Sequence, residues 1–176
     1  MKNATAVLLL PDAGPLITLA YADALDVLLK PRWSVAIVDM VLHEVTRNTT
    51  PTSEMIAKWV SHNRLQVVST KTFKHYQQMQ TTELTIQKKS NLGELAIQEA
   101  MNDFALFDPT PTGIFLFEDH KIARTSFLLP DNCRKVSTRA FLIFLEQKGW
   151  LKSAAEIERS AILNGRHFSR LKFPPE

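Results

Sequence analysis

Short runs of consecutive apolar residues recur along the chain, each followed by a polar residue or a turn. Such runs are typical of strands that are covered on both faces of a sheet. They predict strands over residues 6–10, 33–38, 65–68 and 114–117. Because these runs alternate with helical patterns, they favour a parallel or mostly parallel sheet with helices on both faces.

Between the predicted strands, apolar residues recur at the three- and four-residue spacing of amphipathic helices. This spacing predicts helices over residues 15–20, 23–29, 40–47, 54–63, 92–104, 123–129, 138–148 and 154–164. Asp39 is expected to cap the helix over 40–47. The Gln- and Thr-rich segment 73–89 is expected to be a surface helix or a mobile loop, and residues 48–53 to be a polar break.

The bulk composition indicates a single globular domain over residues 1–176. Of the 176 residues, 45% are hydrophobic and 22% are charged, which is an ordinary balance for a protein with one core. The single cysteine, Cys133, excludes a disulfide within the chain and fits a reducing cytoplasm. The apolar run at 6–10 is too short to span a membrane, so we expect a cytoplasmic protein.

The tryptophans have apolar neighbours and are expected in the core: Trp33, Trp59 and Trp150.

Charge is distributed unevenly between the two parts of the chain. Residues 1–120 carry 10 Lys and Arg against 13 Asp and Glu, a net charge of −3, whereas residues 121–176 carry 11 against 5, a net charge of +6. A basic part of this kind suits a polyanionic partner, although basic residues that solvate helix faces give the same pattern. The candidates for phosphate contacts are Arg124, Arg134, Lys135 and Arg139.

Four carboxylates stand where such a sheet binds ligands. Asp12 follows the first predicted strand and Asp119 the last, and ligands bind beyond the carboxyl ends of parallel strands. Glu44 and Glu94 lie in otherwise apolar helices. Four convergent carboxylates require a compensating charge, and Mg²⁺ and Mn²⁺ prefer oxygen ligands. The set therefore predicts metal-dependent hydrolysis of a phosphodiester.

Each carboxylate also has a structural interpretation. Asp12 could cap the helix that follows it, and Glu44 could pair with an arginine three residues on. Glu94 suits the first turn of a helix, and Asp119 could be a turn residue. Glu118 is the alternative fourth ligand, and because neighbouring strand residues point to opposite faces, we expect only one of the last two to reach a metal.

The order of these motifs resembles the PIN-domain family, which includes the VapC-type toxin ribonucleases. The matching pieces, within residues 6–129, are DAGPLI at Asp12, VLHEV at Glu44, LGELAI at Glu94 and LFEDHKIAR at Asp119. The helical part over about 130–176 is similar to the C-terminal helices of one VapC-like branch. Two features depart from the family: Gly14 replaces the usual Ser or Thr, and the stretch between the last two motifs is long.

The resemblance implies a three-layer α/β/α fold with a central, mostly parallel sheet and extra C-terminal helices. It also implies a ribonuclease whose Mg²⁺ or Mn²⁺ is held by Asp12, Glu44, Glu94 and Asp119. Such a ribonuclease is expected to form a homodimer and, as a toxin, to bind a small antitoxin. The alternative is a catalytically degenerate PIN-like module that binds RNA or a protein, and the long spacing and Gly14 motivate it. A phosphatase with an Asp nucleophile ranks below both, because those enzymes carry Asp-x-Asp where this chain has DAG.

Overall fold

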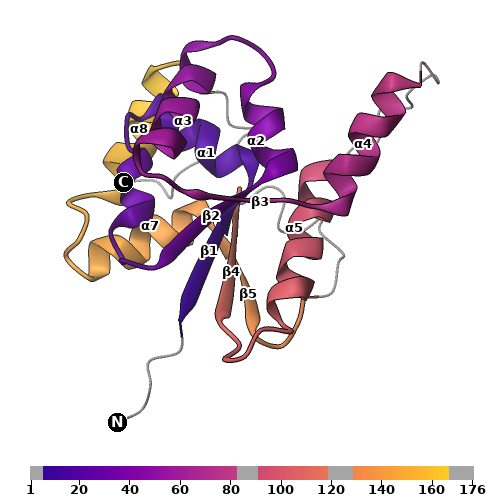
Figure 1. The fold of residues 1–176 in the computed structure, drawn as a ribbon. Helices are drawn as coiled ribbons and strands as arrows, with labels where there is room; N and C mark the ends of the chain where they lie inside the picture. Colours follow the sequence, from indigo (N-terminus) through magenta and orange to yellow (C-terminus); the bar gives the residue numbers. More distant parts are fainter. Residues whose placement is uncertain (1–5, 83–90, 119–128, 167–176) are drawn as a thin grey trace.

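A computed structural model of the chain describes residues 6–82, 91–118 and 129–166. Within these ranges, five parallel strands form one sheet in the order β3-β2-β1-β4-β5. The strands are β1 (Val7–Pro11), β2 (Ser34–Val38), β3 (Gln66–Val68), β4 (Thr112–Phe117) and β5 (Cys133–Ser137). Because β1 is central, its carboxyl end lies between those of β2 and β4 (Figure 1).

Helices cover both faces of this sheet, which gives the predicted three-layer α/β/α architecture. Besides the 3₁₀ helix η1 (Leu25–Leu29), they are α1 (Ala13–Tyr21), α2 (Asp39–Thr46), α3 (Pro51–His62), α4 (Lys71–Thr81), α5 (Leu92–Phe104), α7 (Thr138–Gln147) and α8 (Ala154–Leu163). Figure 1 shows α5 on one side of the sheet and α7 with α8 on the other. No helix in the described ranges is long and apolar enough to cross a membrane.

The core is centred on β1 and β4, the two strands that carry candidate acids at their ends. Leu9 and Leu10 of β1 are fully enclosed, as are Phe115 and Phe117 of β4. The two phenylalanines lie on one face of the strand because side chains alternate, and their ring centroids are 5.0 Å apart. Burial of such a side chain contributes about 1.5–3 kcal/mol, so these strand ends are held firmly in place.

Strand β5 is the element that the hydrophobic pattern does not predict. Its sequence CRKVS contains only two apolar residues, because β5 is an edge strand whose middle is exposed or half-buried. It pairs in parallel with β4, with Phe117 opposite Ser137. The helix predicted over 123–129 lies almost wholly outside the described residues, and the other predicted helices are present.

Helix α3 begins at Pro51, where a polar break was predicted. The N–H of Ser53 donates to Thr50 Oγ1 at 3.1 Å, and the N–H of Thr50 donates back to Ser53 Oγ at 2.8 Å. This reciprocal capping box, with Pro51 in the first turn, starts the helix earlier than its apolar residues indicate. The polar residues of this segment are therefore the start of the helix.

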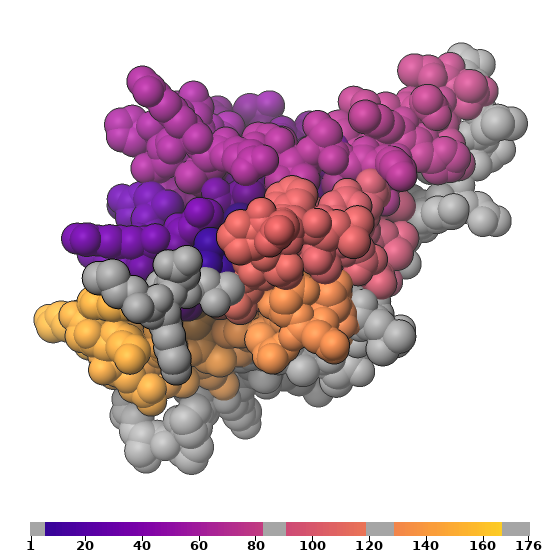
Figure 2. Space-filling view, turned by 60° about the horizontal axis from the view of Figure 1, so that its bottom comes forward, coloured from indigo at the N-terminus to yellow at the C-terminus, as the bar shows by residue number. Residues whose placement is uncertain are grey.

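Helix α4 occupies part of the segment for which a surface helix or a loop was predicted. None of its residues is buried, and it projects from the body of the molecule (Figures 1 and 2). Its attachment is polar: the carboxylate of Glu99 on α5 accepts the N–H of Lys71 at 2.6 Å and the N–H of Thr72 at 3.0 Å. Glu99 therefore holds the N-terminus of α4 against α5.

The prediction that Asp39 caps α2 is wrong. Asp39 is the first residue of this helix. Its carboxylate accepts the N–H of Met40 at 2.7 Å and both the N–H and the hydroxyl of Thr70, at 2.7 and 2.8 Å. Thr70 in turn caps α4 by accepting the N–H of Phe73. The role of Asp39 is thus to join the start of α2 to the start of α4.

The prediction that the tryptophans lie in the core is wrong for Trp150. Trp59 is buried and donates its indole N–H to Asp26 Oδ1 at 2.8 Å, and Trp33 stacks on Phe144 with centroids 5.7 Å apart. Trp150 is 42% exposed, and its ring meets that of Phe144 edge-on. Trp150 directly follows the turn that ends α7, so its apolar sequence neighbours do not surround it.

Candidate metal and active site

Asp12 is the first residue after the central strand β1, and its side chain is almost fully enclosed, at 1% exposure. Its backbone N–H donates to the carbonyl of Leu116 at 2.8 Å, which ties it to β4. Asp12 stands at the N-cap position of α1, but its side chain accepts no capping hydrogen bond. The capping interpretation is therefore wrong for this side chain, and its place at the sheet edge fits a ligand.

Glu44 and Glu94 come from two helices that pack against each other, α2 and α5. Both side chains are half-buried, and Glu94 lies in the first turn of α5. The residue before it is Gly93, and a Cβ atom there would lie 2.9 Å from Glu44 Oε2. The missing side chain at Gly93 therefore lets the Glu44 carboxylate reach the turn that carries Glu94.

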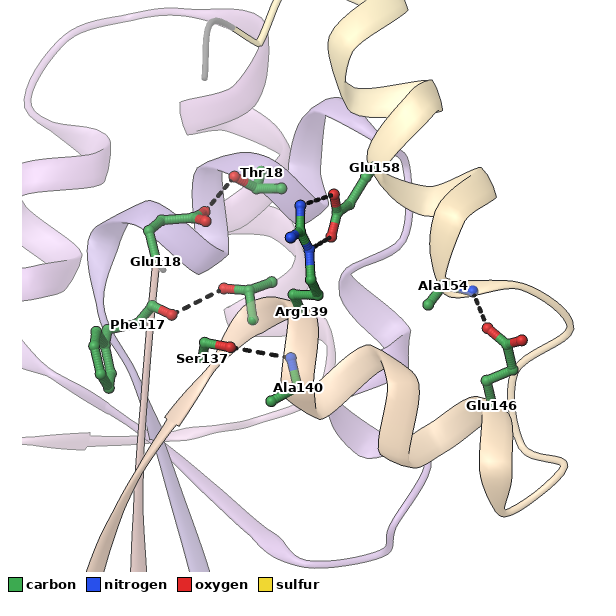
Figure 3. A network of polar contacts seen from close by, with 10 residues as sticks. Thr18, Phe117, Glu118, Ser137, Arg139, Ala140, Glu146, Ala154 and Glu158 are labelled. Carbon is green, nitrogen blue, oxygen red and sulfur yellow. Dashed lines mark hydrogen bonds and ion pairs between the residues drawn. The ribbon is translucent and has the colours of Figure 1, made fainter. Parts of the chain in front are cut away.

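Glu118 follows β4 directly and is also buried, at 4% exposure. Its Oε1 accepts a short hydrogen bond from the hydroxyl of Thr18 on α1, and Figure 3 shows the side chain pointing toward Thr18. A Cβ atom at Gly14 would lie 2.5 Å from Glu118 Cγ. Glu118 thus lies along α1 and fills the space beside Gly14, where a Ser or Thr side chain was expected from the family pattern.

The four predicted ligands are only partly described. Asp12 directly follows β1, Glu44 lies in α2, the helix after β2, and Glu94 lies in the first turn of α5. Asp119 lies outside the described residues. Among the residues that the structure describes, no three His, Cys, Asp or Glu side chains are arranged to hold a metal ion together. The donors themselves are carboxylate oxygens, the type that Mg²⁺ and Mn²⁺ prefer, so their chemistry fits these ions.

The histidine beside Glu44 does not add a cation to this end of the sheet. Burial, and secondarily the nearby Arg47, lower the pKa of His43 from its ordinary value. Its ring contacts Phe73 and Tyr76 of α4, with centroid distances of 5.3 and 5.4 Å. His43 therefore serves as an aromatic contact between α2 and α4 and is neutral near pH 7.

The predicted phosphate contacts lie in different places. Arg134 and Lys135 lie in β5, and Arg134 donates to two nearby backbone carbonyls, at 2.7 and 2.8 Å. Arg139 on α7 pairs with Glu158 on α8 at 3.3 Å, as Figure 3 shows. Arg124 lies outside the described residues. Contacts of these four residues with phosphate stay a prediction. Arg139 also joins α7 to α8 through its ion pair.

Two residues at this end of the sheet escaped the sequence analysis. Arg166 donates from Nε to Thr18 Oγ1 at 3.0 Å, and its Nη2 lies 3.9 Å from Glu118 Oε1. The signal for Thr18 was a lone hydroxyl within an apolar helix. Arg166 had no sequence signal, because it lies 148 residues from Thr18 along the chain.

Comparison with known proteins identifies the family of the chain. The family model DUF3368, described as a PIN domain, matches residues 8–98, just over half of the chain. This chain belongs to the PIN-domain family. The range matched by the family model contains Asp12, Glu44 and Glu94 and ends before Glu118. PIN domains are generally metal-dependent nucleases, so the family indicates a nuclease-type function.

One solved structure supports the fold of this PIN domain. The PIN domain of RRP44 from T. brucei superposes with a TM-score of 0.50 at 17% sequence identity, over 82% of each chain. At this identity the likeness shows the fold alone. No curated protein matches the chain.

Proposed function

We propose that this PIN-domain protein is a Mg²⁺- or Mn²⁺-dependent endoribonuclease of the VapC-like type, acting as the toxin of a toxin–antitoxin pair. The observation that carries the proposal is Asp12, a buried carboxylate at the end of the central strand that does not cap the helix after it. Ligands of a parallel sheet bind beyond the carboxyl ends of its strands, and carboxylate oxygens are the ligands that Mg²⁺ and Mn²⁺ prefer. Family membership adds that PIN domains are generally metal-dependent nucleases.

In this proposal Asp12, Glu44, Glu94 and Asp119 would hold the ion. When bound, such an ion supplies an activated water and neutralises negative charge on a phosphodiester. The backbone of Asp12 is tied to β4 by its hydrogen bond to Leu116, and Gly93 leaves room for the Glu44 carboxylate. In this proposal the chain's own contribution would be carboxylates from the end of β1, from α2 and from α5.

The basic part of the chain supports RNA as the polyanionic substrate. The net charge of +6 over residues 121–176 would attract phosphate and give binding that weakens steeply with salt. Arg124, Arg134 and Lys135 remain candidates for these contacts, with Arg139 shared between Glu158 and phosphate.

The homodimer and the antitoxin belong to the same proposal, as does a cytoplasmic location. Large apolar side chains on α7 and α8 are exposed and could meet a partner: Ile143 at 42%, Ile162 at 45% and Leu163 at 85%. Light scattering during gel filtration tests the dimer. A mass near twice 20.0 kDa is expected, and a mass near 20.0 kDa at micromolar concentration would contradict it.

A non-catalytic PIN-like module remains the second candidate. The observation that favours it is Glu118, the alternative fourth ligand, whose carboxylate is engaged by Thr18 and Arg166. Such a module would bind RNA or a protein equally well with and without a chelator. Cleavage that requires metal would exclude it.

The experiment is RNA cleavage on a panel of structured RNAs with Mn²⁺, Mg²⁺ or EDTA. We compare the wild type with Asp12→Asn and, as a matched control, Asp103→Asn, which removes an exposed acid from the helix that carries Glu94. Cleavage by the wild type and the control, with loss in EDTA and in Asp12→Asn, is expected. Equal cleavage by Asp12→Asn would show that the activity comes from elsewhere.

A further inference from the structure

We infer that Glu118 is a positioning residue and not the fourth metal ligand, and that Arg166, which follows α8, holds it in place. This inference rests on the proposed function and concerns how the same site is built. It uses a part of the chain that the family match does not include, since that match ends at residue 98.

The first step is the direction of the Glu118 side chain. Its Cγ lies over Gly14, and its Oε1 accepts from the hydroxyl of Thr18, one helical turn further along α1 (Figure 3). The space at Gly14 is what admits it, because a Cβ there would come within 2.5 Å of Cγ. The carboxylate is therefore bound along α1 by complementary shape and by a hydrogen bond.

The second step is the charge of this carboxylate. The Glu118 side chain is only 5% exposed, and a buried carboxylate is costly unless it is paired. Arg166 supplies the nearby cation at 3.9 Å and also donates to Thr18 Oγ1 at 3.0 Å. One guanidinium thus contacts both partners of the Glu118–Thr18 hydrogen bond.

The third step is how the fold delivers Arg166. Helix α8 packs on α1, and Asn164 at its C-terminal end donates from Nδ2 to the carbonyl of Tyr21 at 2.8 Å. The N–H of Arg166 donates to the carbonyl of Ala161 at 2.9 Å, which fixes the turn after the helix. The C-terminal helices therefore present Arg166 to α1 at a defined place.

The consequence is a tie between the two strand ends of the candidate site. Asp12 begins the turn into α1, and its N–H is bonded to Leu116 of β4, two residues before Glu118. Through Thr18 and Arg166, Glu118 anchors the end of β4 to that same helix. Because both partners contact Oε1 and hold the side chain along α1, the task of Glu118 is to fix the end of β4 relative to Asp12.

The test is calorimetric Mn²⁺ binding, together with urea unfolding without metal, on six proteins. These are the wild type, D12N, E118Q, E118A, R166A and the double variant E118A/R166A. E118A and R166A are each expected to weaken Mn²⁺ binding about tenfold, the size usual for residues that orient a metal site. The double variant should bind Mn²⁺ no more weakly than either single variant, because the two single substitutions remove the same contact. E118Q can still accept from Thr18, so its loss should be smaller than that of E118A.

The outcomes separate this inference from the proposed function. If E118Q loses Mn²⁺ binding as completely as D12N, Glu118 is a ligand and the inference is overturned. If R166A binds Mn²⁺ like the wild type, or if the effects of R166A and E118A on unfolding add independently, Arg166 does not hold Glu118. If the wild type binds no Mn²⁺ at millimolar concentration, the proposed function itself fails.

Discussion

A Cβ atom on Gly93 would lie 2.9 Å from Oε2 of Glu44, so the two residues share one space between α5 and α2. The approach is possible only because residue 93 has no side chain. It places the Glu44 carboxylate against the turn that carries Glu94. The site is therefore sensitive to a methyl group at a position that is not itself acidic.

Substitution Gly93→Ala should separate metal binding from stability. The atom that the new methyl group meets is the far end of a flexible side chain, which can move aside. Alanine in a helix is favoured over glycine by roughly 0.5–1 kcal/mol, so the free energy of unfolding should stay level or rise slightly. Mn²⁺ affinity should fall, because Glu44 is displaced. Calorimetry and urea unfolding on the same sample measure both, and unchanged Mn²⁺ affinity would argue against Glu44 as a ligand.

Substitution Gly14→Ala, in contrast, should lower the free energy of unfolding. Here the methyl group meets Cγ of Glu118 at 2.5 Å, in the middle of a buried side chain held by Thr18 and Arg166. Such overpacking costs about 1–3 kcal/mol of unfolding free energy. The matched background is Glu118→Ala, in which Cγ is absent and the added cost should largely disappear. An equal cost in both backgrounds would show that the strain arises elsewhere.

Glu99→Gln should loosen α4 in a pH-dependent way. Burial alone would raise the pKa of Glu99. Hydrogen bonds from the N–H groups of Lys71 and Thr72 and from the Thr72 hydroxyl together lower it by more, so the net pKa is below its ordinary value. The carboxylate therefore stabilises the fold above the unfolded-state pKa, and this contribution is lost as the pH falls through the lower, folded-state pKa.

We expect Glu99→Gln to lower the free energy of unfolding by about 1 kcal/mol at pH 7, the usual worth of a helix cap. The difference from the wild type should shrink toward pH 3. Urea unfolding at several pH values measures it, with the exposed Glu54→Gln as control. A difference that stays constant down to pH 3 would contradict this role for Glu99.

The central strands and their acids could be predicted because the signal is local. The runs VLLL and IFLF are apolar since β1 and β4 are enclosed on both faces, and Asp12 stands out at the end of the first. Strand β5 is half-exposed at an edge, so its residues carry no apolar run. The cap at Thr50 was also missed, because the polar residues that start this helix are of the same types as those that form loops.

The contacts of the site itself could not be predicted, because they join residues that are distant in sequence. Thr18 meets Glu118 across 100 positions and Arg166 across 148, and no spacing rule connects them. The same reason explains Arg139, which looked like a surface cation and is paired with Glu158 from the next helix. Sequence patterns locate the acids, whereas the packing of α1 and α8 determines which of them is engaged.

The most direct test of the central claim is calorimetric titration of Mn²⁺ into the wild type, Asp12→Asn and the control Asp103→Asn. If Asp12 is a ligand at the sheet edge, the wild type and the control bind Mn²⁺ saturably and Asp12→Asn does not, while all three unfold at similar urea concentrations. Equal binding by Asp12→Asn, or no binding by the wild type at millimolar Mn²⁺, would contradict the account.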